Sequence, residues 1–328
     1  MLKVVLVGAG RMGRNHVRVL SEAPGFDLVA VVDPVAKLGP DVTVIRSMAD
    51  LANVEFDAAV IATPTATHHQ LALELIAQGK HLLIEKPIAS TAAQGEEIIR
   101  AADAKGTKLV VGHVERFNPA VRKLREILKQ GSLGTAIHFA FTRVGGYPDT
   151  QLTGNNVILD LAVHDIDVLR SLVGPLRLEH SRCHVTWQEG VIDTAEIFLG
   201  AQSGISASVH VNWITPTKIR SIRVTGTRGV CFVDYILQTC ELMGGSLLKQ
   251  NEPTSASYEA IQELYRATDR ILFGVQKVEP LVMQARQFQT FLETGEVGEL
   301  CTGPDALAAV RLAERAVTLP EHSDGEWV

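Results

Sequence analysis

The feature that most restricts the fold of this 328-residue chain lies in its first 33 residues. The stretch LKVVLVGAGRMGRNHVRVL begins with a short apolar run, which predicts a strand buried on both faces of a parallel sheet. Gly8, Gly10 and Gly13 follow in the spacing G-x-G-x-x-G, and a helical pattern begins at once. A second apolar run, DLVAVVD, ends at Asp33, 20 residues after Gly13. This order predicts a strand–turn–helix–strand unit that binds a dinucleotide, with a purely structural turn as the weaker alternative.

The three glycines have separate expected roles. Gly8 permits the tight turn, Gly10 lets the backbone approach a pyrophosphate, and Gly13 lets helix and strand pack closely. The N–H groups at the start of the helix, at Arg11 and Met12, are expected to hold the phosphates.

The acid at the end of the second strand bears on the choice of cofactor. Asp33 is expected to bind the adenosine ribose hydroxyls and to repel a 2′-phosphate. NAD is therefore favoured over NADP, although the nearby Lys37 weakens that preference.

Strands and helices continue to alternate up to residue 118, which predicts a doubly wound parallel sheet. Thr63 and Pro64 follow one strand, and Glu85 and Lys86 follow the next. Ligands bind at the carboxyl ends of such strands, so these four residues are expected at the cofactor.

The helix after Thr63 carries two adjacent histidines. Thr67 is the expected N-cap of this helix. His68 is expected to contact the cofactor, whereas His69 reads as a first-turn surface residue, which is also the alternative for His68.

From about Pro119 the pattern changes to alternating strands joined by short turns, which predicts an open, mostly antiparallel sheet with one face on helices. We therefore expect an α/β protein with a Rossmann domain over 1–118 and a substrate and oligomerisation α+β domain over 119–328. A helix at about 303–319 is expected to pack back on the Rossmann domain. VCFVDYILQTCEL reads as one strand, and residues 244–280 read as an irregular insertion with one helical stretch, YEAIQELYRATDRIL.

Charge and composition exclude several classes of function. The net charge is −6 and no long basic run occurs, which argues against nucleic acid and anionic membranes as partners. No apolar run reaches the roughly 18 residues that a membrane span needs. The four cysteines form no C-x-x-C pair and read as reduced thiols, so we expect a soluble, cytoplasmic protein.

Several motifs in order carry a resemblance to a known family. GAGRMG, ATPTATH, EKP and DLAVHDID resemble those of the Gfo/Idh/MocA oxidoreductases in order and spacing, and PLVMQARQFQTFLETGE with GPDALAAVRLAERAV resembles the helices that close such chains. The likeness spans nearly the whole sequence. It implies an NAD(P)-dependent dehydrogenase acting on a CH–OH group of a sugar or polyol. It also implies a homodimer or homotetramer formed by pairing open sheet faces.

Within the family, VGHVERFNPAV, RVGGYP, VILDLAVHDIDVLR and FVDYILQ look most like the UDP-N-acetylglucosamine 3-dehydrogenase group, which oxidises the sugar 3-hydroxyl with NAD. Many relatives carry a run of glycines where this chain has TGNNVI, which leaves the substrate open. An inositol or free-sugar dehydrogenase of the same family is one alternative. A non-catalytic NAD(P) sensor is another, and the presence of Lys86 and His164 argues against it.

The segment GNNVILDLAVHDIDVL (154–169) places acids and a histidine in an apolar helix. At about 100° per residue, Asp160, His164 and Asp167 fall within about 60° of one another, whereas Asp165 points away and reads as a structural hydrogen-bonding partner. The stripe has three interpretations: a core network, a metal site, or the lining of a cofactor cleft. The dinucleotide fingerprint favours the cleft. Metal is a minor alternative, because no further Cys or His cluster completes a ligand set.

Oxidation of an alcohol needs a base for the hydroxyl proton. His164 suits this role because its ordinary pKa of about 6.5 leaves it largely neutral at pH 7. Asp160, one turn earlier, is placed to fix its tautomer. The resemblance assigns Lys86, Asp160 and His164 to the catalytic set and Asp167 to substrate contact, and it implies a cis bond before Pro87.

Further substrate candidates lie around the domain junction and in the sheet, where each is equally consistent with surface or packing. A guanidinium there would bind a sugar-nucleotide phosphate, or only a neighbouring acid. The candidates are Glu115, Arg116, Asn118, Arg143, Tyr147 and Tyr235.

Overall fold

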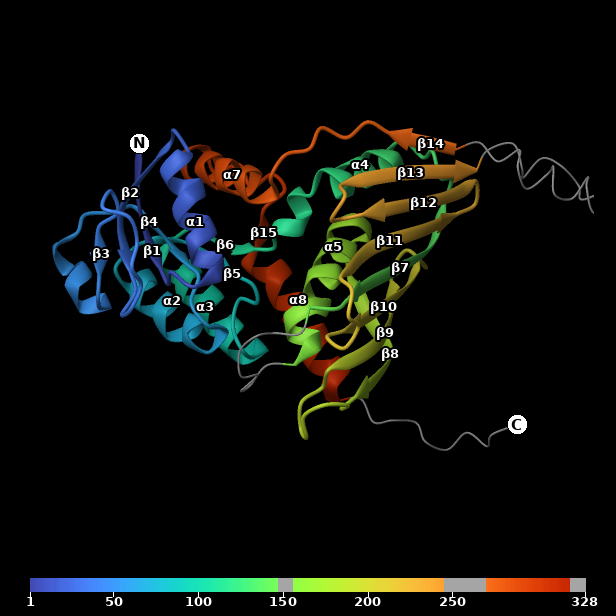
Figure 1. The fold of residues 1–328 in the computed structure, drawn as a ribbon, viewed down its shortest axis with the longest axis horizontal. Helices are drawn as coiled ribbons and strands as arrows, with labels where there is room; N and C mark the ends of the chain where they lie inside the picture. Colours follow the sequence, from blue (N-terminus) through green and yellow to red (C-terminus); the bar gives the residue numbers. More distant parts are fainter. Residues whose placement is uncertain (147–155, 245–269, 319–328) are drawn as a thin grey trace, which may run out of the picture. The chain divides into compact units, whose positions relative to one another are not determined.

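The computed structural model describes residues 1–146, 156–244 and 270–318, and these form two compact units (Figure 1). Unit 1 comprises Met1–Phe117 and Val278–Glu314, and unit 2 comprises Asn118–Lys277 and Arg315–Val328. The chain thus returns to unit 1 through residues that the sequence division at residue 118 leaves in the second domain. No helix within the described ranges is long and apolar enough to span a membrane.

Unit 1 contains the expected doubly wound sheet. Its strand order is β15-β6-β5-β4-β1-β2-β3, parallel throughout except for β15, which runs antiparallel to β6. The sequence did not predict the short strands β3 and β15, because a strand of two residues shows no periodicity. The strands are β1 (Leu2–Val7), β2 (Phe26–Val32), β3 (Val44–Ile45), β4 (Ala58–Ile61), β5 (His81–Glu85), β6 (Leu109–Gly112) and β15 (Cys301–Thr302).

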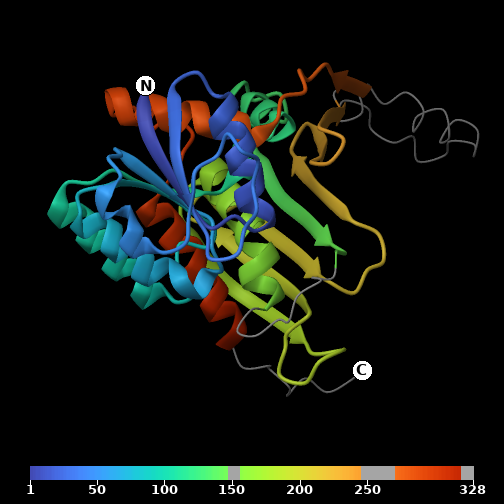
Figure 2. The same cartoon turned by 60° about the vertical axis from the view of Figure 1, so that its left-hand side comes forward.

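Helices cover both faces of this sheet, with α1 and α7 on one face and α2 and α3 on the other (Figure 2). Phe288 of α7 stacks on Phe26 of β2, which ties the returning segment into the core. Helix α8 joins α3 through the ion pair Arg311–Glu96. The helices are α1 (Arg11–Glu22), α2 (His68–Ala77), α3 (Ala92–Lys105), α7 (Pro280–Thr294) and α8 (Gly303–Thr318), with short 3₁₀ turns η1 (Met48–Asn53), η2 (Thr65–Thr67) and η3 (Val114–Phe117).

Unit 2 is built on a mostly antiparallel sheet in the order β14-β13-β12-β11-β7-β10-β9-β8, with β7 and β10 parallel to each other. One face packs on helices α4 and α5, and the other face is open, as expected (Figure 1). The elements are α4 (Pro119–Lys129), β7 (Ala136–Val144), the π-helix η4 (Ile158–Ala162), α5 (Val163–Val173), β8 (Leu176–His184), β9 (Thr194–Ala201), β10 (Ser206–Asn212), β11 (Ile219–Gly226), β12 (Gly229–Asp234), β13 (Thr239–Gly244) and β14 (Arg270–Phe273).

The prediction of one strand over VCFVDYILQTCEL is wrong, because β12 and β13 form a hairpin there. The Asp234 carboxylate accepts hydrogen bonds from the Ile236 and Leu237 amides, and Gln238 adopts φ 51°. An Asp that binds the following amides is a turn signal, but the apolar residues after it hid that signal. The helical stretch predicted after residue 257 lies outside the described residues, except for its last three, which belong to β14.

The N-cap prediction for α2 is also wrong in part. Thr67 occupies the N-cap position, but its hydroxyl donates to the Pro64 carbonyl and contacts the Thr63 hydroxyl, so it caps no helical amide.

Candidate active site

The loop between β1 and α1 has the geometry that a pyrophosphate site requires. Gly8 has φ 94°, and an added Cβ would lie 2.8 Å from the Ala62 backbone. Gly13 packs against the Gly8 carbonyl with no room for a side chain. A Cβ on Gly10 would meet nothing within 4 Å, so the backbone is open to a ligand where the amides of α1 begin.

Asp33 follows β2, and its carboxylate accepts a hydrogen bond from the glycine loop. Its Oδ2 accepts from the Ala9 amide at 2.8 Å, and its Oδ1 accepts from the Val35 and Ala36 amides at 2.9 and 2.7 Å. Burial opposes ionisation, but the three amides outweigh it and hold the pKa of Asp33 below its usual value. A carboxylate has about four acceptor positions, so a position on Oδ2 remains for a ribose hydroxyl.

The turn after β4 carries the next candidates. Thr63 is half-buried beside Gly8, and Pro64 is exposed. His68 is only 1% exposed, and its two ring nitrogens lie 3.0 Å from the Thr63 carbonyl and 2.9 Å from the Pro87 carbonyl. Burial is the largest effect on His68 and lowers its pKa below the usual value, against the opposing effect of these carbonyls.

The turn after β5 carries Glu85 and Lys86. The Lys86–Pro87 bond is cis, as the resemblance implied. Glu85 is buried, its Oε1 lies 2.7 Å from His16 Nε2, and its Oε2 lies 3.3 Å from the Lys86 amide. Lys86 itself is half-buried at the carboxyl-terminal edge of the sheet, directly after β5.

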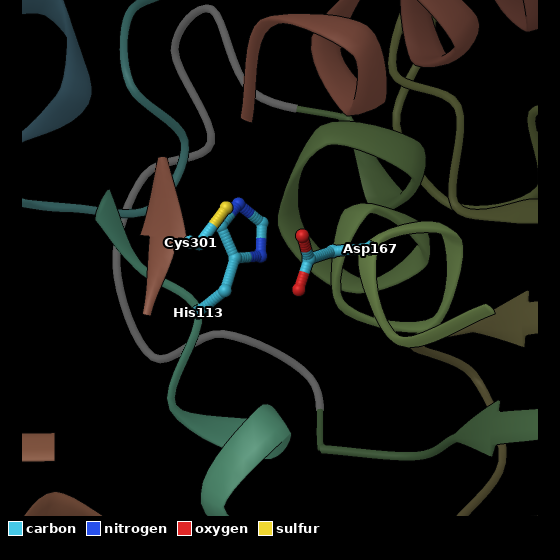
Figure 3. A group of neighbouring side chains, drawn as sticks. All are labelled: His113, Asp167 and Cys301. Carbon is cyan, nitrogen blue, oxygen red and sulfur yellow. The ribbon is translucent and has the colours of Figure 1, made fainter. Parts of the chain in front are cut away.

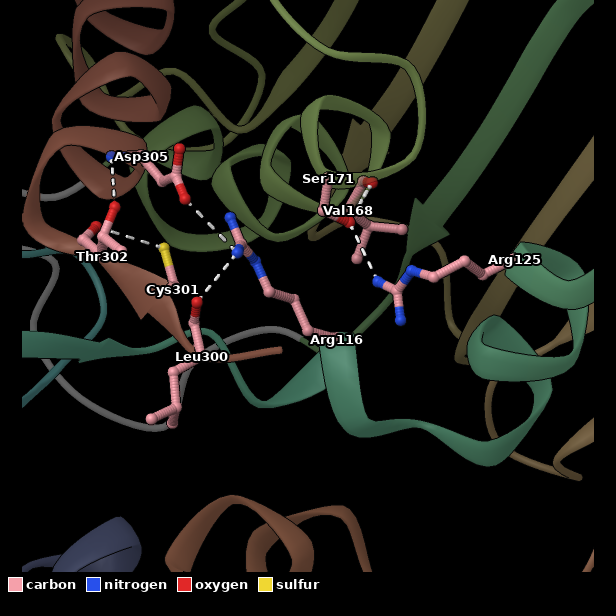
Figure 4. Close-up of polar contacts among 8 residues, drawn as sticks. All are labelled: Arg116, Arg125, Val168, Ser171, Leu300, Cys301, Thr302 and Asp305. Atoms are coloured by element: carbon pink, nitrogen blue, oxygen red, sulfur yellow. Dashed lines mark hydrogen bonds and ion pairs between the residues drawn. The ribbon is translucent and has the colours of Figure 1, made fainter. Parts of the chain in front are cut away.

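Arg116 is bound within unit 1. Its guanidinium donates to the Leu300 carbonyl at 3.2 Å and lies 3.5 Å from Asp305 (Figure 4). Glu115 precedes it in η3 and is half-buried. These contacts show that Arg116 links η3 to the start of α8.

Further buried polar side chains mark this part of unit 1. His113 follows β6, and its ring lies within 4.8 Å of Cys301 Sγ on the neighbouring β15 (Figure 3). Asp167, also drawn in Figure 3, projects from α5 of unit 2.

In unit 2, the acidic and histidine positions lie on η4 and α5. A π-helix makes i→i+5 bonds and turns by less than 100° per residue, so the expected 40° between Asp160 and His164 does not hold. Asp160 and His164 are both half-buried, whereas Asp167 is fully buried. Trp213, which follows β10, donates from Nε1 to the Asp160 carboxylate at 3.2 Å.

Asp165 is a structural partner, as predicted. Its two oxygens accept from Nε and an Nη of Arg143, each at 2.9 Å, and the Tyr235 hydroxyl donates to it at 3.2 Å. The Arg143 guanidinium also lies 4.9 Å from the Tyr235 ring centroid. Asn118 caps α4 through its side-chain oxygen and donates to the Tyr235 carbonyl. The structure thus joins three predicted substrate residues, Asn118, Arg143 and Tyr235, in one buried network, while Tyr147 lies outside the described residues.

A second, smaller contact holds α4 to α5. Arg125 donates to the Ser171 hydroxyl, which donates to the Val168 carbonyl (Figure 4).

Sequence reasoning missed His16, Asn156 and Trp213. Asn156 accepts from the Ile158 and Leu159 amides and so begins η4. It stands in the GNN stretch, and an Asn before an apolar run is an N-cap signal that was available. His16 and Trp213 looked like ordinary members of apolar patterns, and only their long-range partners distinguish them.

Two family models match the chain. Residues 2–113 match the oxidoreductase family with the NAD-binding Rossmann fold, and residues 121–231 match the GFO/IDH/MocA C-terminal domain.

Individual relatives agree with these matches. An inositol 2-dehydrogenase of Ralstonia nicotianae is 30% identical over 241 residues, 64% of this chain and 71% of that protein. The uncharacterized oxidoreductase YrbE of Bacillus subtilis is 27% identical over 95% of this chain and 92% of its own length. UDP-N-acetylglucosamine 3-dehydrogenase GnnA from Acidithiobacillus ferrooxidans superposes with a TM-score of 0.79 at 20% identity, over 96% of each chain, and so shares the fold.

A glycine loop with the geometry that a pyrophosphate requires, an acid held ionised after β2 and the match to the NAD-binding Rossmann model together indicate a nicotinamide-dependent dehydrogenase. The chain belongs to the Gfo/Idh/MocA oxidoreductase family.

Proposed function

We propose that this protein uses NAD to oxidise a secondary hydroxyl, at C3, of a sugar nucleotide such as UDP-N-acetylglucosamine to a ketone. The observation that carries the proposal is the placement of half-buried Asp160 in η4 and half-buried His164 at the start of α5, in a chain where Lys86 directly follows β5. The fold shared with GnnA is consistent with this substrate.

The residues divide the chemistry between them. NAD, when bound, supplies the acceptor for the hydride. His164 takes the hydroxyl proton as a general base, and Asp160 orients its ring and stabilises the imidazolium. The Trp213 N–H restrains the Asp160 carboxylate in turn. Lys86 orients the hydroxyl or serves as the acid and base itself.

NAD is the proposed cofactor because Asp33 is held ionised where an adenosine ribose would bind. The 2′-phosphate of NADP carries more than one negative charge at neutral pH, and the ionised Asp33 would repel it there. Comparing the two cofactors at equal concentration tests this choice.

An inositol or free-sugar dehydrogenase is the second candidate, because the Ralstonia inositol 2-dehydrogenase is 30% identical to this chain. Asp167 and the residues around it serve as proposed substrate contacts in either case.

A substrate screen separates the two candidates. Reduction of NAD is followed at 340 nm with UDP-N-acetylglucosamine, other nucleotide sugars, inositols and free sugars. We expect turnover with the nucleotide sugar and its loss in His164→Ala with NAD binding retained. Turnover with inositol and none with any nucleotide sugar would replace the lead candidate by the second.

The open face of the unit 2 sheet is the proposed subunit interface. Phe198 and Phe232 project from it at 43% and 40% exposure among polar neighbours such as Thr142 and Ser208. Apolar side chains of this size on an open sheet face favour burial against a second copy.

A further inference from the structure

His68 lies between two turns of the Rossmann sheet that follow neighbouring strands. One turn follows β4 and carries Thr63, and the other follows β5 and carries Lys86 and Pro87. The imidazole spans them, with Nε2 at 3.0 Å from the Thr63 carbonyl and Nδ1 at 2.9 Å from the Pro87 carbonyl. A neutral imidazole carries one N–H, so it donates to one of these carbonyls at a time, according to its tautomer. Because both ring nitrogens face backbone oxygens and the side chain is 1% exposed, neither is open to a ligand.

A second buried histidine acts on the other side of the same turn. His16 of α1 is 2% exposed and lies 2.7 Å from Glu85, the last residue of β5. Glu85 in turn lies 3.3 Å from the Lys86 amide. The carboxylate lies beside Gly112, where an added Cβ would be 3.0 Å from it, so the glycine leaves the room that Glu85 occupies.

The main chain is therefore restrained on both sides of Lys86. His16 contacts Glu85, the residue before Lys86. His68 contacts the carbonyl of Pro87, the residue after Lys86. The two histidines come from α1 and α2, whose N-terminal ends flank the glycine loop and the Thr63 turn. The position of the lysine is thus tied to the elements expected at the cofactor.

We propose that His68, together with His16, is a positioning residue that fixes Lys86 relative to the cofactor-binding turns. His68 then acts through the Lys86 turn and touches neither cofactor nor substrate. The inference rests on the proposed function for the role of Lys86, but the restraint itself follows from the burial of both histidines and their contacts with Glu85, Thr63 and Pro87.

The test compares His68→Leu, which removes both ring nitrogens, with His68→Gln, whose single amide reaches one carbonyl. Misplacement of a catalytic group by about 1 Å can cost about 100-fold in rate. We expect kcat to fall about 10- to 100-fold in His68→Leu and less in His68→Gln, with KM for NAD changed by less than about threefold. His69→Leu, which loses only the surface contact with Glu97, is the matched control and should keep wild-type kcat.

A second readout is independent of turnover. Lysine labelling by an acetylating reagent, followed by peptide mass spectrometry, reports the local setting of Lys86. Its labelling rate should change at least about threefold in His68→Leu, while that of Lys108 stays constant, because labelling follows amine exposure and pKa. In a Lys86→Met background, adding His68→Leu should cost no further activity, since residues acting as a unit are non-additive.

The outcomes distinguish two failures. If His68→Leu folds and shows wild-type kcat and unchanged Lys86 labelling, the positioning role is overturned. If the wild-type protein turns over no nucleotide sugar but Lys86 labelling still responds to His68, the proposed substrate fails and the positioning role stands.

Discussion

At the scale of single residues, the histidines differ in burial and in the groups that contact each ring. His68 and His16 are buried against carbonyl and carboxylate oxygens, whereas His164 is half-buried on α5. Of these three, His164 is the one that we propose exchanges a proton with a ligand. Burial, not residue type, thus separates the structural histidines from the candidate base.

His68 should make stability depend on pH. Burial lowers its pKa in the folded protein, while the unfolded chain keeps a value of about 6.5. The stabilisation from neutral His68 is present above that value and is lost as pH falls through the folded pKa, because the unfolded state binds the proton first. Urea unfolding from about pH 7 to 5 should show a steeper loss in wild type than in His68→Gln. Parallel curves would contradict the assignment.

At the scale of elements, η4 and the start of α5 are held from several sides. Asn156 caps η4, the Val157 amide donates to the Ile192 carbonyl, and Trp213 holds Asp160. π-helical turns are rare in proteins overall, but those that occur are frequently found at functional sites. The cap and the π-turn together set where Asp160 and His164 point.

Removing the cap should loosen this helix. Asn156→Ala leaves the Ile158 and Leu159 amides without their acceptor, which typically costs about 1 kcal/mol of stability. We expect lower kcat, measured by turnover, and unchanged affinity for NADH, measured by fluorescence titration. Asn156→Asp keeps the capping oxygen and serves as the control, and equal loss in both variants would refute a capping role.

At the scale of the whole molecule, each of the two units has its own sheet. Unit 1 needs α7 from the end of the chain, since Leu281, Phe288 and Leu292 belong to its core. Unit 2 buries one face of its sheet under α4 and α5 and leaves the other open.

The open face gives a prediction for assembly. Phe232→Asp places a charge where the proposed interface is apolar, so it should shift the protein toward monomers. Sedimentation velocity of wild type and variant measures this, with Val35→Asp, an exposed position in unit 1, as the control. A wild-type protein that sediments as a monomer would remove the interface proposal.

The sequence by itself determined the start of the Rossmann unit, because Gly8, Gly10 and Gly13 act within one local turn whose geometry they set. It also separated Asp165 from its neighbours, since helical period is a local property. Tertiary structure alone decided the partners: Asp165 meets Arg143 22 residues away, Asp160 meets Trp213 53 residues away, and Glu85 meets His16 69 residues away. A buried polar group must find a partner, but long-range packing chooses which one, and no local pattern encodes that choice.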